Sequence, residues 1–185
     1  MRQETTTRTL YQFDELTDKA KEQARDWYRD GALDYDWWEF VYEDAGHIGL
    51  TIEGFDLDRH RHVDGHLDVS GLESCHRIMK EHGQSCDTYR LAAEYLPQFE
   101  TLAKKIDDMQ ANEESEDSEL DVGDEIETLE KEYVYQLMEE YASMLQSEYE
   151  NQLSNESVDE SIRGNEYEFT EDGHRASFHK RRGRA

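Results

Sequence analysis

The longest periodic segment of the chain, residues 124–153, constrains the fold more than any other feature. Apolar side chains recur along it every three or four residues, which is the period of an amphipathic α-helix. Most of its acidic residues lie on the other face. We therefore expect one long helix whose apolar stripe is covered by the rest of the chain or by a second copy in a homodimer. The stripe consists of Ile126, Leu129, Tyr133, Leu137, Tyr141 and Met144, flanked by Val134, Met138 and Leu145.

Short strands are predicted in three places. Apolar and polar residues alternate in 50–58 and again in 63–69, so a hairpin is predicted over about 50–70. The segment TLYQF at 9–13 is predicted to be a short first strand. The segment EYEFTEDG near the C-terminus is predicted to be a last strand that ends in an Asp-Gly turn.

Helices are predicted from apolar periodicity together with capping residues. Thr17 is a predicted N-cap for a helix that ends at Gly31, and Asp34 or Asp36 is the expected cap of the next one. The further predictions are a helix over 72–82, a helix from Ser85 or Asp87 to about Asp107 that is interrupted near Pro97, and a short helix with a capping box at Ser157 and Glu160 that Gly164 closes.

The expected fold class is therefore α+β. One small antiparallel sheet, made of the hairpin at about 50–70 and the C-terminal strand, should pack against several helices, one of them long.

Acidic residues dominate the charge: 46 Asp and Glu stand against 20 Lys and Arg, for a net charge of −26. Low hydrophobicity with high net charge is typical of disordered chains. Half of the 20 aromatic residues fall between Tyr11 and Phe55, however, and a disordered segment would not carry them. We therefore expect a folded body with acidic surfaces.

The domain organisation is predicted from the distribution of this charge. Eight of the residues 111–125 are acidic, so a flexible acidic linker or loop is expected at 110–121. The other expected parts are an aromatic-rich α+β part at 1–109, an acidic helical part with the final strand at 122–173, and a disordered basic tail at 174–185, the folded parts forming one composite domain.

Composition also excludes several classes of protein. No window is apolar enough for a transmembrane helix, and the first residues, MRQETTTRTL, lack the apolar region of a secretory signal. Two cysteines are too few for a disulfide framework, which agrees with a reducing cytoplasm. The negative charge disfavours direct nucleic-acid binding by the main body and favours basic partners.

One cluster has the composition of a metal site: His60, His62, His66, His76, His82, Cys75 and Cys86. On a strand, His60 and His62 would share a face, and zinc could use them together with Asp64, His66 or a cysteine. The spacing matches none of the usual paired zinc motifs, so the alternative is a solvent-exposed hairpin face. We expect no cofactor, and the candidate zinc ligands are His60, His62, His66 and Cys75.

Catalytic signatures are missing, since the sequence has no G-x-S-x-G, P-loop, G-x-G-x-x-G or H-E-x-x-H motif. Carboxylate pairs carry no information here because a quarter of the residues are acidic. The aromatic run Trp37, Trp38 and Phe40 has helical spacing, which favours a place in the core over a stacking platform. We therefore expect a non-enzymatic protein.

The total charge is large enough to imitate a nucleic acid. A compact body of this length is about 40 Å long, and duplex DNA of that length carries on the order of 24 charges. The helix at 124–153 alone, with nine acids over about 45 Å, falls well below this density. The alternative is a surface that only confers solubility. The acids expected to bind a partner are Asp124, Glu125, Glu127, Glu130, Glu132, Glu139 and Glu140.

Long segments resemble a family of proteins from bacteriophages and prophages that are labelled antitoxins of a toxin–antitoxin stability system. The segments are TLYQFDELTDKAKEQARDWYRD, DYDWWEFVYEDA, IEGFDLDR and EYENQLSNESVDESIRGNEYEFTEDGHR, with a looser match at HGQSCDTYRLAAEYL. The resemblance covers roughly residues 8–59 and 132–175 and implies an accessory phage protein made in the bacterial cytoplasm. The N-terminus lacks the basic helix of self-regulating antitoxins, so autoregulation is not expected.

Three functions follow, in order of preference. The first is a counter-defence protein whose acidic surface occupies the nucleic-acid groove of a host nuclease or CRISPR-type complex, with binding that weakens in salt. The second is an antitoxin-like regulator that neutralises one partner through an apolar surface and barely responds to salt. The third is a metal-dependent enzyme that uses the cluster from His60 to Cys86.

Overall fold

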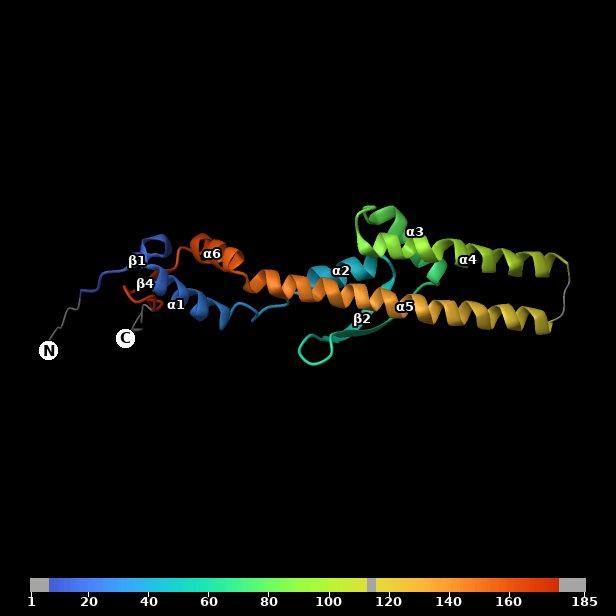
Figure 1. Ribbon diagram of the computed structural model, residues 1–185, viewed down its shortest axis with the longest axis horizontal. Helices are drawn as coiled ribbons and strands as arrows, with labels where there is room; N and C mark the ends of the chain where they lie inside the picture. Colours follow the sequence, from blue (N-terminus) through green and yellow to red (C-terminus); the bar gives the residue numbers. More distant parts are fainter. Residues whose placement is uncertain (1–6, 113–115, 177–185) are drawn as a thin grey trace, which may run out of the picture. The chain divides into compact units, whose positions relative to one another are not determined.

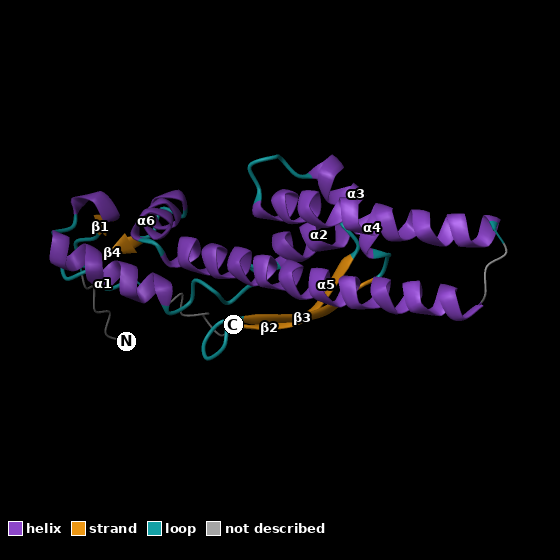
Figure 2. Ribbon diagram, turned by 45° about the vertical axis from the view of Figure 1, so that its right-hand side comes forward, coloured by secondary structure: helices purple, strands orange, loops and turns teal. Residues whose placement is uncertain are grey.

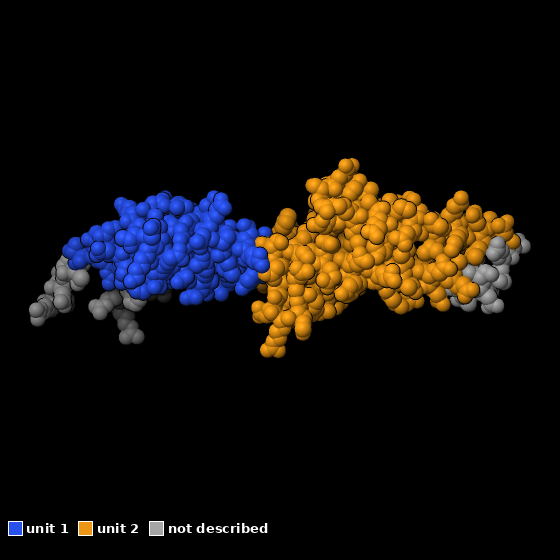
Figure 3. Space-filling model, viewed as in Figure 1, with its two compact units in different colours: residues 1–37, 148–185 blue, residues 38–147 orange. Residues whose placement is uncertain are grey.

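The chain is an α+β protein of helices and two small sheets (Figure 1). The computed structural model describes residues 7–112 and 116–176, and their side chains except those of 116–120. The chain divides into two compact units (Figure 3): unit 1 consists of residues 1–37 and 148–185, and unit 2 of residues 38–147. These units differ from the boundaries expected from charge, because the first and last segments of the chain share one core.

Unit 1 is built from the two ends of the chain. Its β1 pairs antiparallel with β4, so that Tyr11 lies opposite Phe169. The first and last strands predicted from the sequence therefore exist, but the last strand pairs with the first and not with the hairpin. The single sheet that was expected is wrong, because the described residues form two sheets of two strands each. The elements of unit 1 are β1 (Tyr11–Gln12), a 3-10 helix η1 (Phe13–Glu15), α1 (Asp18–Arg29), the end of α5, α6 (Asn155–Gly164) and β4 (Glu168–Phe169).

Helix α1 begins as the sequence predicts. The Thr17 hydroxyl accepts a hydrogen bond from the amide of Ala20, which satisfies one of the free donors of the first turn. Ala20 and Ala24 lie one turn apart and are both buried, which places one side of α1 in the core of unit 1. That core also contains Phe13 and Phe169, whose rings meet edge to face at 6.5 Å.

The turn after β4 confirms the predicted Asp-Gly turn. Gly173 has φ 86°, and a methyl group there would overlap the backbone carbonyl of Ala20, so this position requires glycine. Beyond it, the amide of Ala176 donates to the carbonyl of Glu168 at 2.8 Å. The first residues of the expected basic tail are thus bound to β4, and 177–185 lie outside the described residues.

Unit 2 contains the predicted hairpin, β2 and β3. The two strands lie side by side (Figure 2). Leu50 lies opposite Leu67, and a bulge between Ile52 and Gly54 shifts the register. The elements of unit 2 are α2 (Glu39–His47), β2 (Leu50–Asp56), β3 (His62–Leu67), α3 (Gly71–Glu81), α4 (Asp87–Ala111) and α5 (Glu116–Leu153) as far as residue 147.

The long helices differ from the sequence prediction at their ends. Helix α4 continues through Pro97 to Ala111, and α5 begins at Glu116, so residues 110–111 and 116–121 of the predicted linker are helical. Acidic residues are favoured in the first turn of a helix because the helix dipole is positive there. The acids that suggested a linker therefore suit the start of α5. Residues 113–115 lie outside the described residues.

The apolar stripe of α5 is covered by the chain itself over most of its length. Tyr133, Leu137, Tyr141 and Leu145 follow one another at intervals of four residues and are fully buried. The ring of Tyr133 lies 5.3 Å from that of Tyr95 on α4, and its hydroxyl lies 3.1 Å from the Ser74 hydroxyl on α3. Tyr133 therefore joins three helices of unit 2.

The N-cap residues of two helices were predicted wrongly. Helix α2 has Trp38 as its N-cap residue, with no side-chain cap, in place of Asp34 or Asp36. In α6 the capping hydroxyl belongs to Ser154, which accepts from the amide of Ser157.

The aromatic run at the start of α2 is only partly in the core. Trp37 is buried and Trp38 packs on Phe55 with ring centres 5.7 Å apart, whereas Phe40 is 70% exposed. Phe40 is therefore a surface residue and not a core residue. Within the described ranges no helix combines the length and apolar character needed to cross a membrane.

Candidate partner-binding groove

Helices α4 and α5 run side by side in unit 2 (Figures 1 and 2). Two polar contacts join them: the Gln136 amide donates to the Tyr95 hydroxyl at 2.8 Å, and Lys105 pairs with Glu125 at 3.1 Å. The later residue of α4, Lys105, contacts the earlier residue of α5, Glu125, so the two helices are antiparallel. A groove of about 780 Å³ opens mainly between these two contacts.

The floor of the groove is apolar and one rim is acidic. Leu102 and Leu129 line it and are only half-buried, although Tyr133, one turn further along α5, is fully buried. The lining residues are Pro97, Gln98, Thr101 and Leu102 on α4, and Asp121, Asp124, Glu125, Thr128, Leu129 and Glu132 on α5.

The acidic rim follows from helical spacing. Asp121, Glu125, Thr128 and Glu132 recur at i, i+4, i+7 and i+11, which keeps them on one face of a helix, and Asp124 lies beside them. We call Asp121, Asp124, Glu125 and Glu132 the groove carboxylates.

The groove carboxylates are mostly uncompensated. Only Glu125 has a cation within 4.0 Å among the described residues, and that cation is Lys105. At the end of the groove, burial and then the charges of Glu132 and Glu94 raise the pKa of Tyr95. The groove therefore carries negative charge beside exposed apolar surface.

The structure brings together three of the seven acids that the sequence nominated, namely Asp124, Glu125 and Glu132. Glu127 and Glu130 lie on another side of α5, where they line a cavity of about 460 Å³ against β3. Glu127 pairs with Lys131 at 2.5 Å, which lowers the pKa of the Glu127 carboxyl.

Glu130 serves the fold. Its carboxylate accepts a hydrogen bond from the amide of Gly71 at 2.7 Å, at the first turn of α3, where Ser70 is the N-cap. Glu139 lies 4.0 Å from Arg61 of the hairpin loop, and Glu140 is half-buried.

Asp121 and the groove floor were not among the binding residues predicted from the sequence. Asp121 had been assigned to the linker, so its helical phase with Glu125 and Glu132 was not considered. The spacing of Asp121, Glu125 and Glu132 in the sequence would have placed all three on one face of a helix. The incomplete cover of Leu102 and Leu129 had no signal in the sequence, because it depends on which elements lie beside α4 and α5.

The candidate zinc ligands are not brought together. His62 and His66 lie exposed on β3, where His66 contacts Glu53 at 3.1 Å and Asp68 at 3.3 Å. Cys75 lies in the core on α3, and burial raises the pKa of its thiol to about 11. Among the described residues no three potential ligands are placed to share an ion.

Unit 2 also contains a network of polar side chains in its interior. His82 Nδ1 lies 2.7 Å from the Thr88 hydroxyl, and its Nε2 lies 3.6 Å from Asp44, which accepts a hydrogen bond from Tyr141 at 2.8 Å. The order of groups is similar to an acid–base relay, but Thr88 and Tyr141 are buried and offer no surface to a substrate. The group ties α2, α4 and α5 to the end of α3.

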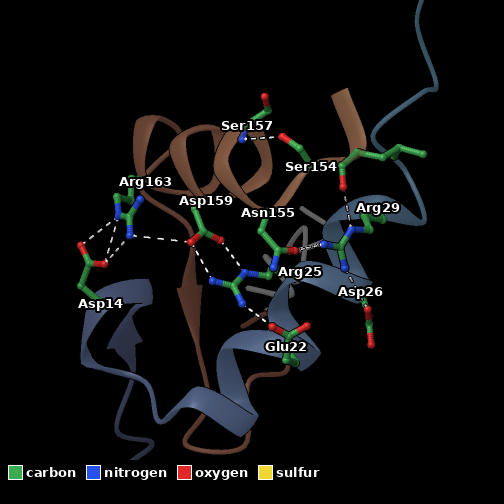
Figure 4. A network of polar contacts seen from close by, with 11 residues as sticks. Asp14, Glu22, Arg25, Asp26, Arg29, Ser154, Asn155, Ser157, Asp159 and Arg163 are labelled. Atoms are coloured by element: carbon green, nitrogen blue, oxygen red, sulfur yellow. Dashed lines mark hydrogen bonds and ion pairs between the residues drawn. The ribbon is translucent and has the colours of Figure 1, made fainter. Parts of the chain in front are cut away.

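Several charged residues of unit 1 form arginine–carboxylate pairs (Figure 4). Arg25 binds Asp159 through two hydrogen bonds of 2.6 and 2.7 Å, and Arg163 binds Asp14 at 2.9 to 3.1 Å. Arg163 also lies 3.9 Å from Asp159. These groups join α1, η1 and α6, and they are engaged with one another.

No family model, curated protein or solved structure matches the chain. The function is therefore inferred from the residues of the groove and its surroundings.

Proposed function

We propose that the protein acts without catalysis, by binding a basic partner protein through the groove carboxylates. The observation that carries the proposal is the row of Asp121, Asp124, Glu125 and Glu132 on α5, of which, among the described residues, only Glu125 has a cation within 4.0 Å. Opposite charges steer association and fix its orientation, and such a row attracts a surface rich in Lys and Arg.

The spacing of these charges can be compared with that of a nucleic acid. From Asp121 to Glu132 the helix rises by about 17 Å, at about 1.5 Å per residue. The three intervals between four carboxylates over this length give a mean spacing of about 5.5 Å, compared with about 3.4 Å along one strand of DNA and about 1.7 Å along the duplex. The row is thus sparser than either, and closer to one strand than to a duplex.

The partner we propose is a host defence complex that holds nucleic acid, such as a nuclease or CRISPR-type effector. The resemblance to phage and prophage proteins supports a bacterial host and its cytoplasm as the place of action. By occupying the basic groove of the effector, the protein would exclude the nucleic acid that normally lies there.

A capture experiment from host lysate at two salt concentrations tests the proposal. We expect a basic protein to be retained at about 0.05 M salt and released at about 0.5 M, because screening shortens the range of the attraction. The retained protein should lose its own nucleic acid when the purified chain is added. Retention that is unchanged by salt would exclude mimicry.

Two sets of charge reversals distinguish the effect of the groove carboxylates on binding from the effect of the net charge. The triple variant Asp121→Lys, Asp124→Lys and Glu132→Lys should abolish capture. A control that changes the net charge equally uses exposed acids of unit 1, Asp30→Lys, Glu160→Lys and Glu171→Lys, and should retain the partner.

A second candidate function has its own observation. Tyr135 is 66% exposed beside Val134 and Met138 at the cavity between β3 and α5, which is an apolar surface of the kind that an antitoxin-like regulator would use. Binding through this surface should hardly respond to salt, and Tyr135→Ala should weaken it while the triple groove variant should not.

A further inference from the structure

We propose that the α4–α5 groove receives an amphipathic helix of the partner, with apolar side chains on the groove floor and Lys or Arg side chains along the groove carboxylates. This inference rests on the proposed function and specifies the form of the partner at the same site.

The groove has the dimensions of a short helical segment. The two contacts that join α4 and α5, Tyr95 with Gln136 and Lys105 with Glu125, lie near its ends. Its rim extends for about 17 Å, the rise of roughly three helical turns. Helix-in-groove recognition places residues at i, i+3, i+4 and i+7 of the ligand on an apolar floor.

Exposed apolar surface coincides with the acidic rim. Leu102 of α4 and Leu129 of α5 both line the groove and are half-buried, whereas Tyr133, Leu137 and Tyr141 of the α5 stripe are fully buried in unit 2. A partner that carried positive charge alone would leave this apolar floor in contact with water. Covering it contributes binding energy that charge cannot supply.

The charges decide between a second copy and a basic partner. A second copy seated on this groove would bring its own acidic rim close to Asp124 and Glu132, and each chain carries a net charge of −26. The rim cation Lys105 is already paired with Glu125. A helix with Lys or Arg at intervals of three or four residues supplies the missing positive charge and can match the spacing of the carboxylates.

Two synthetic peptides of about 14 residues, or four helical turns, provide the test. The first has Leu on one helical face and Lys along its edges; the second has the same composition in an order that spreads Leu around the helix. We expect the full chain to bind the first peptide about tenfold more tightly at low salt, measured by fluorescence anisotropy.

Paired variants locate the binding site on α5. Leu129→Ser should weaken binding of the first peptide about tenfold, whereas Val134→Ser, a similar loss of half-buried apolar surface at the β3 cavity, should leave it unchanged. Thr101 is exposed, so Thr101→Trp should block the groove without disturbing the core. This variant decides the matter if Leu129→Ser lowers the stability of the fold.

Each alternative result has a defined meaning. Equal binding of the two peptides would overturn the helix-in-groove proposal and leave the electrostatic function standing. Failure of both peptides to bind at low salt would overturn both. A doubled mass in light scattering that Thr101→Trp returns to that of one chain would show that a second copy occupies the groove.

Discussion

Carboxylates are used differently in unit 1 and in the groove of unit 2. In unit 1, Asp159 binds Arg25 through two hydrogen bonds, and Asp14 binds Arg163 (Figure 4). On the groove, Asp124 and Glu132 have no cation within 4.0 Å among the described residues. The same type of residue thus holds segments from the two ends of the chain together in one region and is left uncompensated in the other.

The difference has an energetic meaning. Both side chains of the Arg25–Asp159 pair are 15% exposed, so removing one partner leaves the other charge poorly solvated. Asp124 and Glu132 are exposed to solvent before binding, and their removal deprives no cation of the described residues of a partner within 4.0 Å. Unit 1 should therefore respond to carboxylate loss through stability, and the groove through binding.

The largest predicted effect is that of Asp159→Ala. It removes the carboxylate that accepts two hydrogen bonds from Arg25, leaves the more exposed Glu22 beside Arg25, and removes a neighbour of Arg163. We expect the free energy of unfolding to fall by about 3 kcal/mol. Urea denaturation of the full chain, followed by tryptophan fluorescence, measures it, because Trp27 packs against the core of unit 1. Asp124→Ala is the control and should change the value by less than about 0.5 kcal/mol. Similar losses from both variants would remove the distinction between the regions.

Pro97, the only proline of the chain, should have the next largest effect, with the opposite sign. It lies inside α4 on the groove and cannot donate the amide hydrogen bond of a helix interior. Pro97→Ala should raise the free energy of unfolding by about 2 kcal/mol, since proline costs about 3 kcal/mol relative to alanine at such a position. A fall in thermal stability would show that the proline ring packs favourably enough to outweigh that cost.

Glu130 and Glu132 test the comparison within a single helix. Glu130→Gln should lower the free energy of unfolding by about 1 kcal/mol, because a charged acceptor at the first turn of α3 is replaced by a neutral one. Glu132→Gln should leave stability unchanged and weaken binding of a basic partner. Both variants replace one carboxylate of α5 by an uncharged amide of nearly the same shape. Their effects on the free energy of unfolding and on peptide binding can therefore be compared directly. The opposite pattern would place the functional face of α5 toward β3.

Sequence patterns predicted elements whose determinants are local. The Thr17 cap, the alternation in β2 and β3, and the stripe of Tyr133, Leu137 and Tyr141 each depend on residues a few positions apart, and the structure confirms them.

Other features depend on distant partners and could not be predicted. The strand at Phe169 pairs with Tyr11, and Glu130 reaches the amide of Gly71, which is 59 residues away. Four of the seven nominated acids lie away from the groove, since their spacing fixes a helical face but not the element beside that face. The apolar floor at Leu102 and Leu129 could not be predicted, because it depends on how α4 packs beside α5.

The smallest predicted effect concerns pH and the exposed pair of Asp14 and Arg163. The hydrogen bond from Arg163 lowers the pKa of Asp14 from its ordinary value of 3.8. Because the pKa is lower in the folded chain than in the unfolded one, the ionised carboxylate stabilises the fold above that ordinary value. This contribution is lost as the pH falls through the lowered, folded-state pKa.

The variant Asp14→Asn should therefore differ slightly from the natural chain at neutral pH, and the difference should shrink as the pH falls below about 3.8 and vanish once Asp14 is protonated in the folded chain. Urea denaturation at a series of pH values measures it, and Arg163→Gln should show the same convergence. If the difference persists at the lowest pH, Asp14 stabilises unit 1 through contacts of its neutral form, and Arg25 with Asp159 is then the main ion pair that joins the two ends of the chain in unit 1.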